Sequence, residues 1–237
     1  MIERVALLEV LRSGELRVTG RLLDASNASF CAQVTGDGIE AACVYKPRRG
    51  ERPLDDFPDG TLGRREVAAF LVSEAMGWDI VPPTAWREEG SFGPGMAQLW
   101  IDVDPAADVM ALLREDLAAL RRIVVFDAIV NNGDRKGGHL LPVADRIHGV
   151  DHGVCFSVEP KLRTILWSWR GRPLDDEAIE GLQRVAGALR DGLAAELRDL
   201  LAKAEVAATE RRIERLLQDR VYPLPDAGRR VVPWPPF

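Results

Sequence analysis

Cysteine is scarce in this chain. The three cysteines, Cys31, Cys43 and Cys155, are odd in number, lie far apart and have no metal-ligand spacing. This pattern argues against a disulfide framework and against a cysteine-bound metal. We therefore expect three reduced thiols in a cytoplasmic protein, because disulfides persist mainly in oxidising compartments.

Long apolar runs and an excess of positive charge are also missing. No apolar run approaches the roughly 20 residues of a membrane-spanning helix. Charges at Glu3, Arg4, Glu9 and Arg12 interrupt the apolar stretch that a signal peptide needs. The net charge of −6 gives the whole surface no attraction for nucleic acid or anionic lipid. The sequence predicts no transmembrane segment and no nucleic-acid partner, and it leaves local membrane contact and the oligomeric state open.

The chain does have apolar periodicity of two kinds. Short or alternating apolar runs predict strands over residues 15–23, 30–35, 40–46, 80–84, 96–101, 140–143 and 146–150. Helical spacing predicts helices over residues 1–13, 64–76, 109–130 (one long helix or a pair) and several between 174 and 220. The segment 221–237 holds five prolines and shows neither period.

Strands and helices are segregated along the chain, and this arrangement predicts an α+β protein in two lobes. A length of 237 residues allows two small lobes around a cleft. We expect a β-rich lobe over residues 1–102 and a mainly helical lobe over residues 103–237, with a hinge near residues 99–104. A cleft between two lobes is a usual place for a ligand.

Two charged residues stand at the edge of the predicted cleft. Lys46 ends the third predicted strand, and Val44 shares its strand face because side chains alternate. An apolar residue followed by an inward lysine suits a nucleotide base followed by its phosphates. Glu66 lies near the start of the next predicted helix and is the candidate that orients Lys46. Each has an ordinary alternative, a solvated strand-end lysine and a carboxylate at a helix start.

The loop at residues 131–141, NNGDRKGGHLL, mixes charge with glycine in a way that packing does not require. Asp134 is followed by Arg135 and, five residues on, by His139. Asp151 follows the predicted hairpin, in the sequence Gly-Val-Asp-His-Gly. Phosphoryl transfer needs such residues, because a cation binds phosphates, carboxylates bind Mg²⁺ and an oriented carboxylate accepts the hydroxyl proton. The order and context of these residues are a stronger signal than any one of them.

The segment 126–141, FDAIVNNGDRKGGHLL, resembles the catalytic loop of the phosphatidylinositol 3- and 4-kinases, above all the type II 4-kinases. It also resembles HipA-type bacterial Ser/Thr kinases and an actinobacterial group of phosphatidylinositol-kinase-like proteins. The shared pattern is an Asp-Arg pair after a helix that ends in Asp-x-x-x-x-Asn, here Asp127 and Asn132. The resemblance covers roughly residues 16–153 and implies an atypical kinase fold.

The resemblance assigns a role to each candidate. It implies that Lys46 holds phosphates beside Glu66, that Asp134 is the catalytic aspartate with Arg135 beside it, and that Asp151 binds the metal. The implied nucleotide contacts further include Val44, the phosphate loop with Ser26, Asn27 and Ser29, and the adenine-binding hinge with Gln98, Leu99, Trp100 and Ile101. The implied ligands are ATP and Mg²⁺ or Mn²⁺.

Two departures from the family pattern bear on activity. The phosphate loop has no glycine, so the hydroxyls of Ser26 and Ser29 would replace its backbone contacts. The second metal ligand is His139 instead of Asn, a softer nitrogen instead of an oxygen. We predict transfer of the γ-phosphoryl group of ATP to a hydroxyl of an unidentified acceptor. The alternatives are a nucleotide-binding pseudokinase that acts as an interaction module and transfer of AMP on the same fold.

Two further segments carry weaker signals. Trp167 and Trp169 lie among four basic residues, where a kinase places its activation or substrate loop. Packing of both tryptophans on the helical lobe is the favoured interpretation, and binding of an acidic partner or a lipid headgroup is the alternative. The tail at 221–237 is expected to lie across the body of the protein, and a docking segment for a partner is the weaker alternative.

Overall fold

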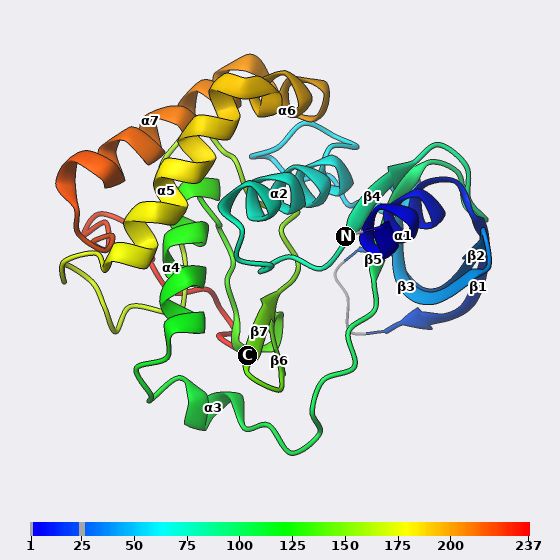
Figure 1. Cartoon of the computed structure of the whole chain (residues 1–237), viewed down its shortest axis with the longest axis horizontal. Helices are drawn as coiled ribbons and strands as arrows, with labels where there is room; N and C mark the ends of the chain where they lie inside the picture. The colour runs from blue at the N-terminus through cyan, green and yellow to red at the C-terminus, as the bar shows by residue number, and fades with distance from the viewer. Residues whose placement is uncertain (1, 24–26) are drawn as a thin grey trace.

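The structure is a computed structural model that describes residues 2–23 and 27–237. Figure 1 shows a sheet with α1 beside it at one end of the molecule and a helical lobe at the other. The strands are β1 (Glu15–Leu22), β2 (Ser29–Gly36), β3 (Ile39–Pro47), β4 (Thr84–Arg87), β5 (Gly95–Leu99), β6 (Leu140–Val143) and β7 (Arg146–Gly149). The helices are α1 (Ile2–Ser13), α2 (Leu62–Met76), α3 (Val109–Leu112), α4 (Ala118–Val130), α5 (Asp176–Ala188), α6 (Ala194–Leu200) and α7 (Lys203–Asp219).

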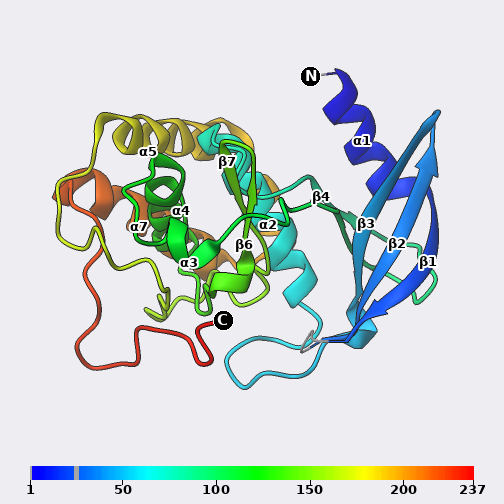
Figure 2. The same ribbon diagram turned by 90° about the horizontal axis from the view of Figure 1, so that it is seen from below.

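The sheet of the first lobe is antiparallel, with the strand order β1-β2-β3-β5-β4. One of its faces packs against α1, and Val10 and Leu11 are buried there against Cys43 and Tyr45. Figure 2 shows this lobe on the right, separated from the helices by α2. The opposite face of β3 is therefore the one that remains for a ligand.

The start of β4 differs from the prediction, which set a strand over residues 80–84. Ile80 and Val81 are buried in the core of the helical lobe, but they pair with no strand of the described chain. Pro82 and Pro83 follow, and neither has an N–H to donate to a ladder. Strand pairing therefore begins only at Thr84, so the predicted strand was wrong in position.

The helical lobe is built around α4, whose residues from Ile123 to Val130 are buried almost throughout. Helices α2, α5 and α7 pack around it in one core. The apolar stretch at 109–130 forms a pair of helices, α3 and α4, which is one of the two predicted forms. No helix of the described residues is long and apolar enough to cross a membrane.

The tail after α7 runs back over the helical lobe (Figure 2). Thr164 donates its backbone N–H to the Val231 carbonyl at 3.0 Å, and Gly137 donates to the Pro236 carbonyl at 2.9 Å. The Phe237 ring lies so close to Gly137 that a Cβ there would come within 1.9 Å of a ring carbon. The tail thus lies across the body, as predicted, and only glycine fits at position 137.

Candidate active site

Strand β3 carries Val44 and Lys46 to the face opposite α1. Cys43 and Tyr45 point into the α1 core, so their neighbours point the other way and are partly buried. Val44 pairs with Gln98 of β5, and cross-strand partners share a face. Gln98 is buried and donates from Nε2 to Thr84 Oγ1 at 2.8 Å. Val44, Lys46 and Gln98 therefore line one surface of the sheet.

Lys46 joins the two lobes. Its Nζ donates to Glu66 Oε1 at 2.6 Å and to Asp151 Oδ1 at 2.9 Å, although Asp151 lies 105 residues away in sequence. Burial lowers the pKa of Lys46, but the charges of Asp151 and Glu66 outweigh burial and raise that pKa above its usual value. An ammonium group has three N–H donors, so one remains for a phosphate oxygen.

Glu66 is a buried carboxylate with both oxygens in use. Its Oε1 accepts from Lys46, and its Oε2 accepts the backbone N–H of His152 at 2.8 Å. Glu66 thereby fixes Lys46 and the main chain next to Asp151 together. The sequence indicated the pairing with Lys46, but no sequence signal indicated the bond to His152, because the donor is a backbone group.

Asp151 is an accessible carboxylate next to Lys46. It has a left-handed backbone with φ of 62°, which Asp tolerates better than most residues. The positive charge of Lys46 is the largest of the influences that lower the pKa of Asp151, so the carboxylate is ionised at neutral pH. Its side chain is 51% exposed, so a metal can approach it from solvent.

His139 lies beside Asp151 but has its own partners. Its Nε2 is 3.4 Å from Asp151 Oδ2, and its Nδ1 accepts the Lys136 backbone N–H at 3.4 Å. Burial lowers the pKa of His139, so the neutral ring is favoured. If Nδ1 accepts, the proton lies on Nε2 and points at Asp151. Ligation of a metal through Nε2 therefore requires a shift of the proton to Nδ1 and the loss of one long hydrogen bond.

The side chains of Asp151 and His139 could hold a divalent metal only if a phosphate-bearing ligand supplied further donor atoms. No cluster of three or more His, Cys, Asp or Glu side chains in the described chain could hold a metal by itself. Mg²⁺ commonly takes one or two protein carboxylates and completes its shell with phosphate oxygens and water. Asp151, with His139 beside it, matches that requirement.

Asp134 lies in the 131–141 loop, next to a cavity. The Asn132 side chain accepts the Asp134 backbone N–H at 2.9 Å, and Lys136 Nζ lies 3.3 Å from Asp134 Oδ2. Burial raises the pKa of Asp134, which makes it a better proton acceptor. The cavity has a volume of about 350 Å³ and is also lined by Phe57 and Lys161. It offers space for an acceptor beside the carboxylate.

Arg135 is not brought to the surface of the loop. Its side chain is fully buried and forms hydrogen bonds with both oxygens of Asp127, at 2.8 and 3.0 Å. It also donates to the Val150 carbonyl at 3.0 Å and contacts His152 Nε2 at 2.6 Å. Arg135 therefore cannot touch a ligand in this arrangement. It connects the 131–141 loop to the segment that carries Asp151.

The predicted adenine-binding hinge residues differ in how far they are free to contact a ligand. The Leu99 and Trp100 backbone N–H groups already donate to the Pro83 and Ala42 carbonyls, and the Leu99 side chain packs in the α1 core. Ile101 follows, partly buried, as the next hinge residue.

Ser26 of the predicted phosphate loop lies outside the described residues. Asn27 Oδ1 accepts the Arg52 backbone N–H at 2.8 Å, and Ser29 is buried with a weak bond to the Asn27 carbonyl at 3.5 Å. Ser29 begins β2, whose next residue, Phe30, pairs with Tyr45 beside Lys46. The described part of this loop thus lies at the Lys46 end of the sheet, held by the segment around Arg52.

Known proteins place this arrangement in context. No family model matches the sequence. Protein Rv2133c of Mycobacterium tuberculosis (strain ATCC 25618 / H37Rv) is 44% identical over an alignment that covers 96% of this chain and 94% of that protein. The chain belongs to the family of Protein Rv2133c.

Three solved structures share the fold of this Rv2133c family member. The Golgi casein kinase with Mn/ADP bound aligns with a TM-score of 0.57 at 15% identity, over 97% of this chain and 78% of that one. Hydra Fam20 with sugar aligns with a TM-score of 0.57 at 12% identity, over 92% and 88%. The Helicobacter pylori proinflammatory kinase CtkA aligns with a TM-score of 0.54 at 10% identity, over 90% and 94%.

At these identities the likeness shows the fold alone. The predicted α+β, two-lobed, atypical kinase-like fold is confirmed. The closer resemblance to phosphatidylinositol kinases stays a prediction, as do the lobe boundary after residue 102 and the roles of the individual site residues.

Proposed function

We propose that this protein transfers the γ-phosphoryl group of ATP to a hydroxyl. The observation that carries the proposal is the position of Lys46, which bonds Glu66 of α2 and Asp151 of the helical lobe at once. A kinase needs a lysine held in this way, so that its remaining donor meets phosphate oxygens. The shared fold and the Mn/ADP found in the Golgi casein kinase support the same reading.

The roles of the other residues follow from their places. Asp134 accepts the proton of the acceptor hydroxyl, whose oxygen forms a bond to the γ-phosphorus. The bond from that phosphorus to the β–γ bridging oxygen breaks, and ADP leaves with the electron pair. Asp151 and His139 would hold Mg²⁺ or Mn²⁺, which offsets phosphate charge. The acceptor is a protein, a lipid or a small molecule, and the cavity beside Asp134 is where it would enter.

Label transfer and ligand-induced stabilisation test this proposal. With γ-labelled ATP and Mn²⁺ we expect ADP release and label on an acceptor, whereas α-label on a product would mean AMP transfer. A melting shift equivalent to about 2.7 kcal/mol is expected at about 100 times the Kd. Asp151→Ala should remove the metal-dependent part of this shift, and Asp145→Ala, at an exposed turn, should not. Unchanged melting with ATP and either metal would contradict a nucleotide site.

His139 yields a separate prediction about metal preference. His139→Asn replaces a nitrogen by an oxygen donor, and Mg²⁺ prefers oxygen shells. We expect this variant to retain transfer and to shift the Mg²⁺-to-Mn²⁺ activity ratio toward Mg²⁺, and His139→Ala to weaken the binding of both metals. Equal metal ratios in all three proteins would leave His139 as a residue that only holds Asp151 in place.

A further inference from the structure

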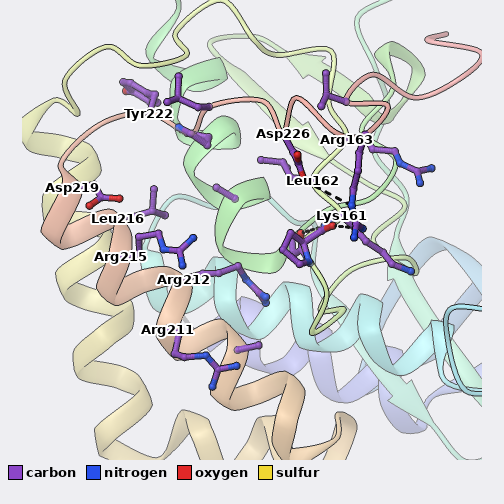
Figure 3. A pocket seen from close by; sticks show the side chains of 18 of the residues that line it. Lys161, Leu162, Arg163, Arg211, Arg212, Arg215, Leu216, Asp219, Tyr222 and Asp226 are labelled. Carbon is purple, nitrogen blue, oxygen red and sulfur yellow. Dashed lines mark hydrogen bonds and ion pairs between the residues drawn. The ribbon is translucent and has the colours of Figure 1, made fainter.

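A second cavity, of about 460 Å³, lies in the helical lobe between α7, residues 158–167 and the tail at 221–231 (Figure 3). Lys46, Glu66, Asp134 and Asp151 lie outside its lining, and only Lys161 and Arg163 are shared with the cavity beside Asp134. The volume falls within the range of about 300–1,000 Å³ that is typical of small-molecule sites. This cavity therefore has the size for a ligand of its own.

The lining of this cavity is strongly basic. It includes seven arginine and lysine side chains and two aspartates, in a chain whose net charge is −6. Arg211, Arg212 and Arg215 project from α7 on one side, with Lys161 and Arg163 across from them (Figure 3). Lys161 and Arg163 lie more than 40 residues before the arginines of α7 and the tail, so the tertiary fold brings these two groups of charges together.

Most of these charges have no carboxylate partner. Within the described chain, Lys161 pairs with Asp56 and Arg229 with Asp226, but no ion pair involves Arg163 or the α7 arginines. Several uncompensated guanidinium groups around one concave space favour an anion there.

Arg212 is the clearest example of a guanidinium group without a carboxylate partner. Its guanidinium donates to the Ile129 carbonyl at 2.7 Å, the Ser157 carbonyl at 3.2 Å and Thr209 Oγ1 at 2.9 Å. All three acceptors are neutral, so the charge stays uncompensated, and burial lowers the pKa of Arg212 to about 10. A guanidinium has five N–H donors, so two remain for a ligand in the cavity.

Arg211 and Arg215 are two like charges that lie close together on α7. They lie four residues apart on α7, where like charges face each other and destabilise a helix. Both are exposed, and neither side chain forms a hydrogen bond within the described chain. An anion between them would convert this repulsion into attraction.

We propose that this cavity binds a small molecule that carries more than one phosphate group. Guanidinium groups match phosphate oxygens in pairs of parallel hydrogen bonds, and several unpaired arginines call for more charge than one carboxylate supplies. Leu216, Trp167 and Tyr222 line the same cavity and give the body of the ligand an apolar surface. The concave shape favours a soluble molecule over a membrane surface.

Hydrogen bonds connect the lining of this cavity to the 131–141 loop. Asn131, which lines the cavity, donates from Nδ2 to the Ser157 and Glu159 carbonyls at 2.8 and 2.7 Å. Arg163 donates its backbone N–H to the Asn132 carbonyl, and its own carbonyl accepts from Arg135. A ligand held by these side chains should therefore slow amide hydrogen exchange over residues 157–165.

Inorganic pyrophosphate without metal, in the presence of EDTA, is the probe, measured by titration calorimetry. We expect wild-type protein to bind it and Arg211→Gln/Arg215→Gln to bind at least about tenfold more weakly, because two charge-assisted bonds are lost. Arg190→Gln/Arg198→Gln removes the same charge from exposed positions outside the cavity and should bind like wild type. Lys46→Met should also bind like wild type.

Each other outcome overturns the proposal. Absence of binding to wild type, or equal weakening in both double variants, would mean that the cavity selects no phosphate ligand. Weakening only in Lys46→Met would place pyrophosphate in the proposed nucleotide site. Two further probes are phosphatidylcholine–phosphatidylserine vesicles and an oligoglutamate peptide. If the protein binds vesicles but not pyrophosphate, and this binding needs Arg211 and Arg215, the surface is a membrane site. The same result with the peptide would make it a peptide site. Failure of phosphoryl transfer would leave this result untouched, because no turnover is measured.

Discussion

Replacement of Asp134 by Asn should lower phosphoryl transfer by roughly a hundredfold or more and leave nucleotide affinity nearly unchanged. A positioned general base contributes about 10²–10⁴ in rate, and Asn cannot accept the proton. Nucleotide affinity should survive because Lys46 and Asp151, the residues proposed to hold phosphates and metal, form no hydrogen bond or ion pair with Asp134 among the described residues. Single-turnover transfer and the ATP-induced melting shift measure the two effects separately.

The Asp134 experiment has a matched control. Asp145→Asn makes the same change at an exposed turn between β6 and β7 and should transfer at the wild-type rate. Asp134→Asn also keeps the size of the side chain, and its backbone N–H still donates to Asn132. Loss of affinity and of transfer in equal measure would make Asp134 a binding or folding residue and contradict its role as the base.

The second large effect concerns stability. Asp127 and Arg135 form an ion pair in which both side chains are fully buried, at 2.8 Å. Removal of one partner leaves a buried charge without compensation, and such changes cost about 3–5 kcal/mol. Asp127→Leu should therefore lower the free energy of unfolding by about that amount, measured by urea denaturation.

A double variant separates the ion pair from the packing around it. Asp127→Leu/Arg135→Met removes both charges, and apolar replacement of a buried pair is often near neutral. We expect the double variant to recover most of the stability that Asp127→Leu loses. Phosphoryl transfer by the double variant should still be slower than in the wild type, because Arg135 no longer holds the Val150 carbonyl next to Asp151. Recovery of both stability and transfer would show that Arg135 has no part in positioning the site.

Local patterns in the sequence determined much of this protein. Alternation and helical spacing depend on neighbouring residues, so the strands β1–β3, the helices α2 and α4 and the β6–β7 hairpin were predictable. The chemical kinds of Lys46, Glu66, Asp134 and Asp151, and their order, pointed to phosphoryl transfer before any contact was known. Their roles remain predictions, but their types are a property of the sequence alone.

Contacts between distant residues were decided only by the tertiary structure. The bond from Glu66 to the His152 backbone has no sequence signature, because every residue carries the same N–H. The burial of Arg135 depends on a carboxylate that packing brings to it, and an exposed loop cation has the same local sequence. The proton position on His139 is likewise set by Lys136 and Asp151.

The basic cavity is the clearest case of a feature that only the tertiary structure decided. Its arginines lie in α7, in residues 158–167 and in the tail, and each segment alone is an ordinary charged stretch. Like charges repel, so no local pattern predicts that they gather. They do so here because the apolar faces of α4 and α7 pack together and the tail bonds back to Thr164, and the arginines are carried along. The sequence determined which charges exist, and the packing of apolar surfaces decided where they meet.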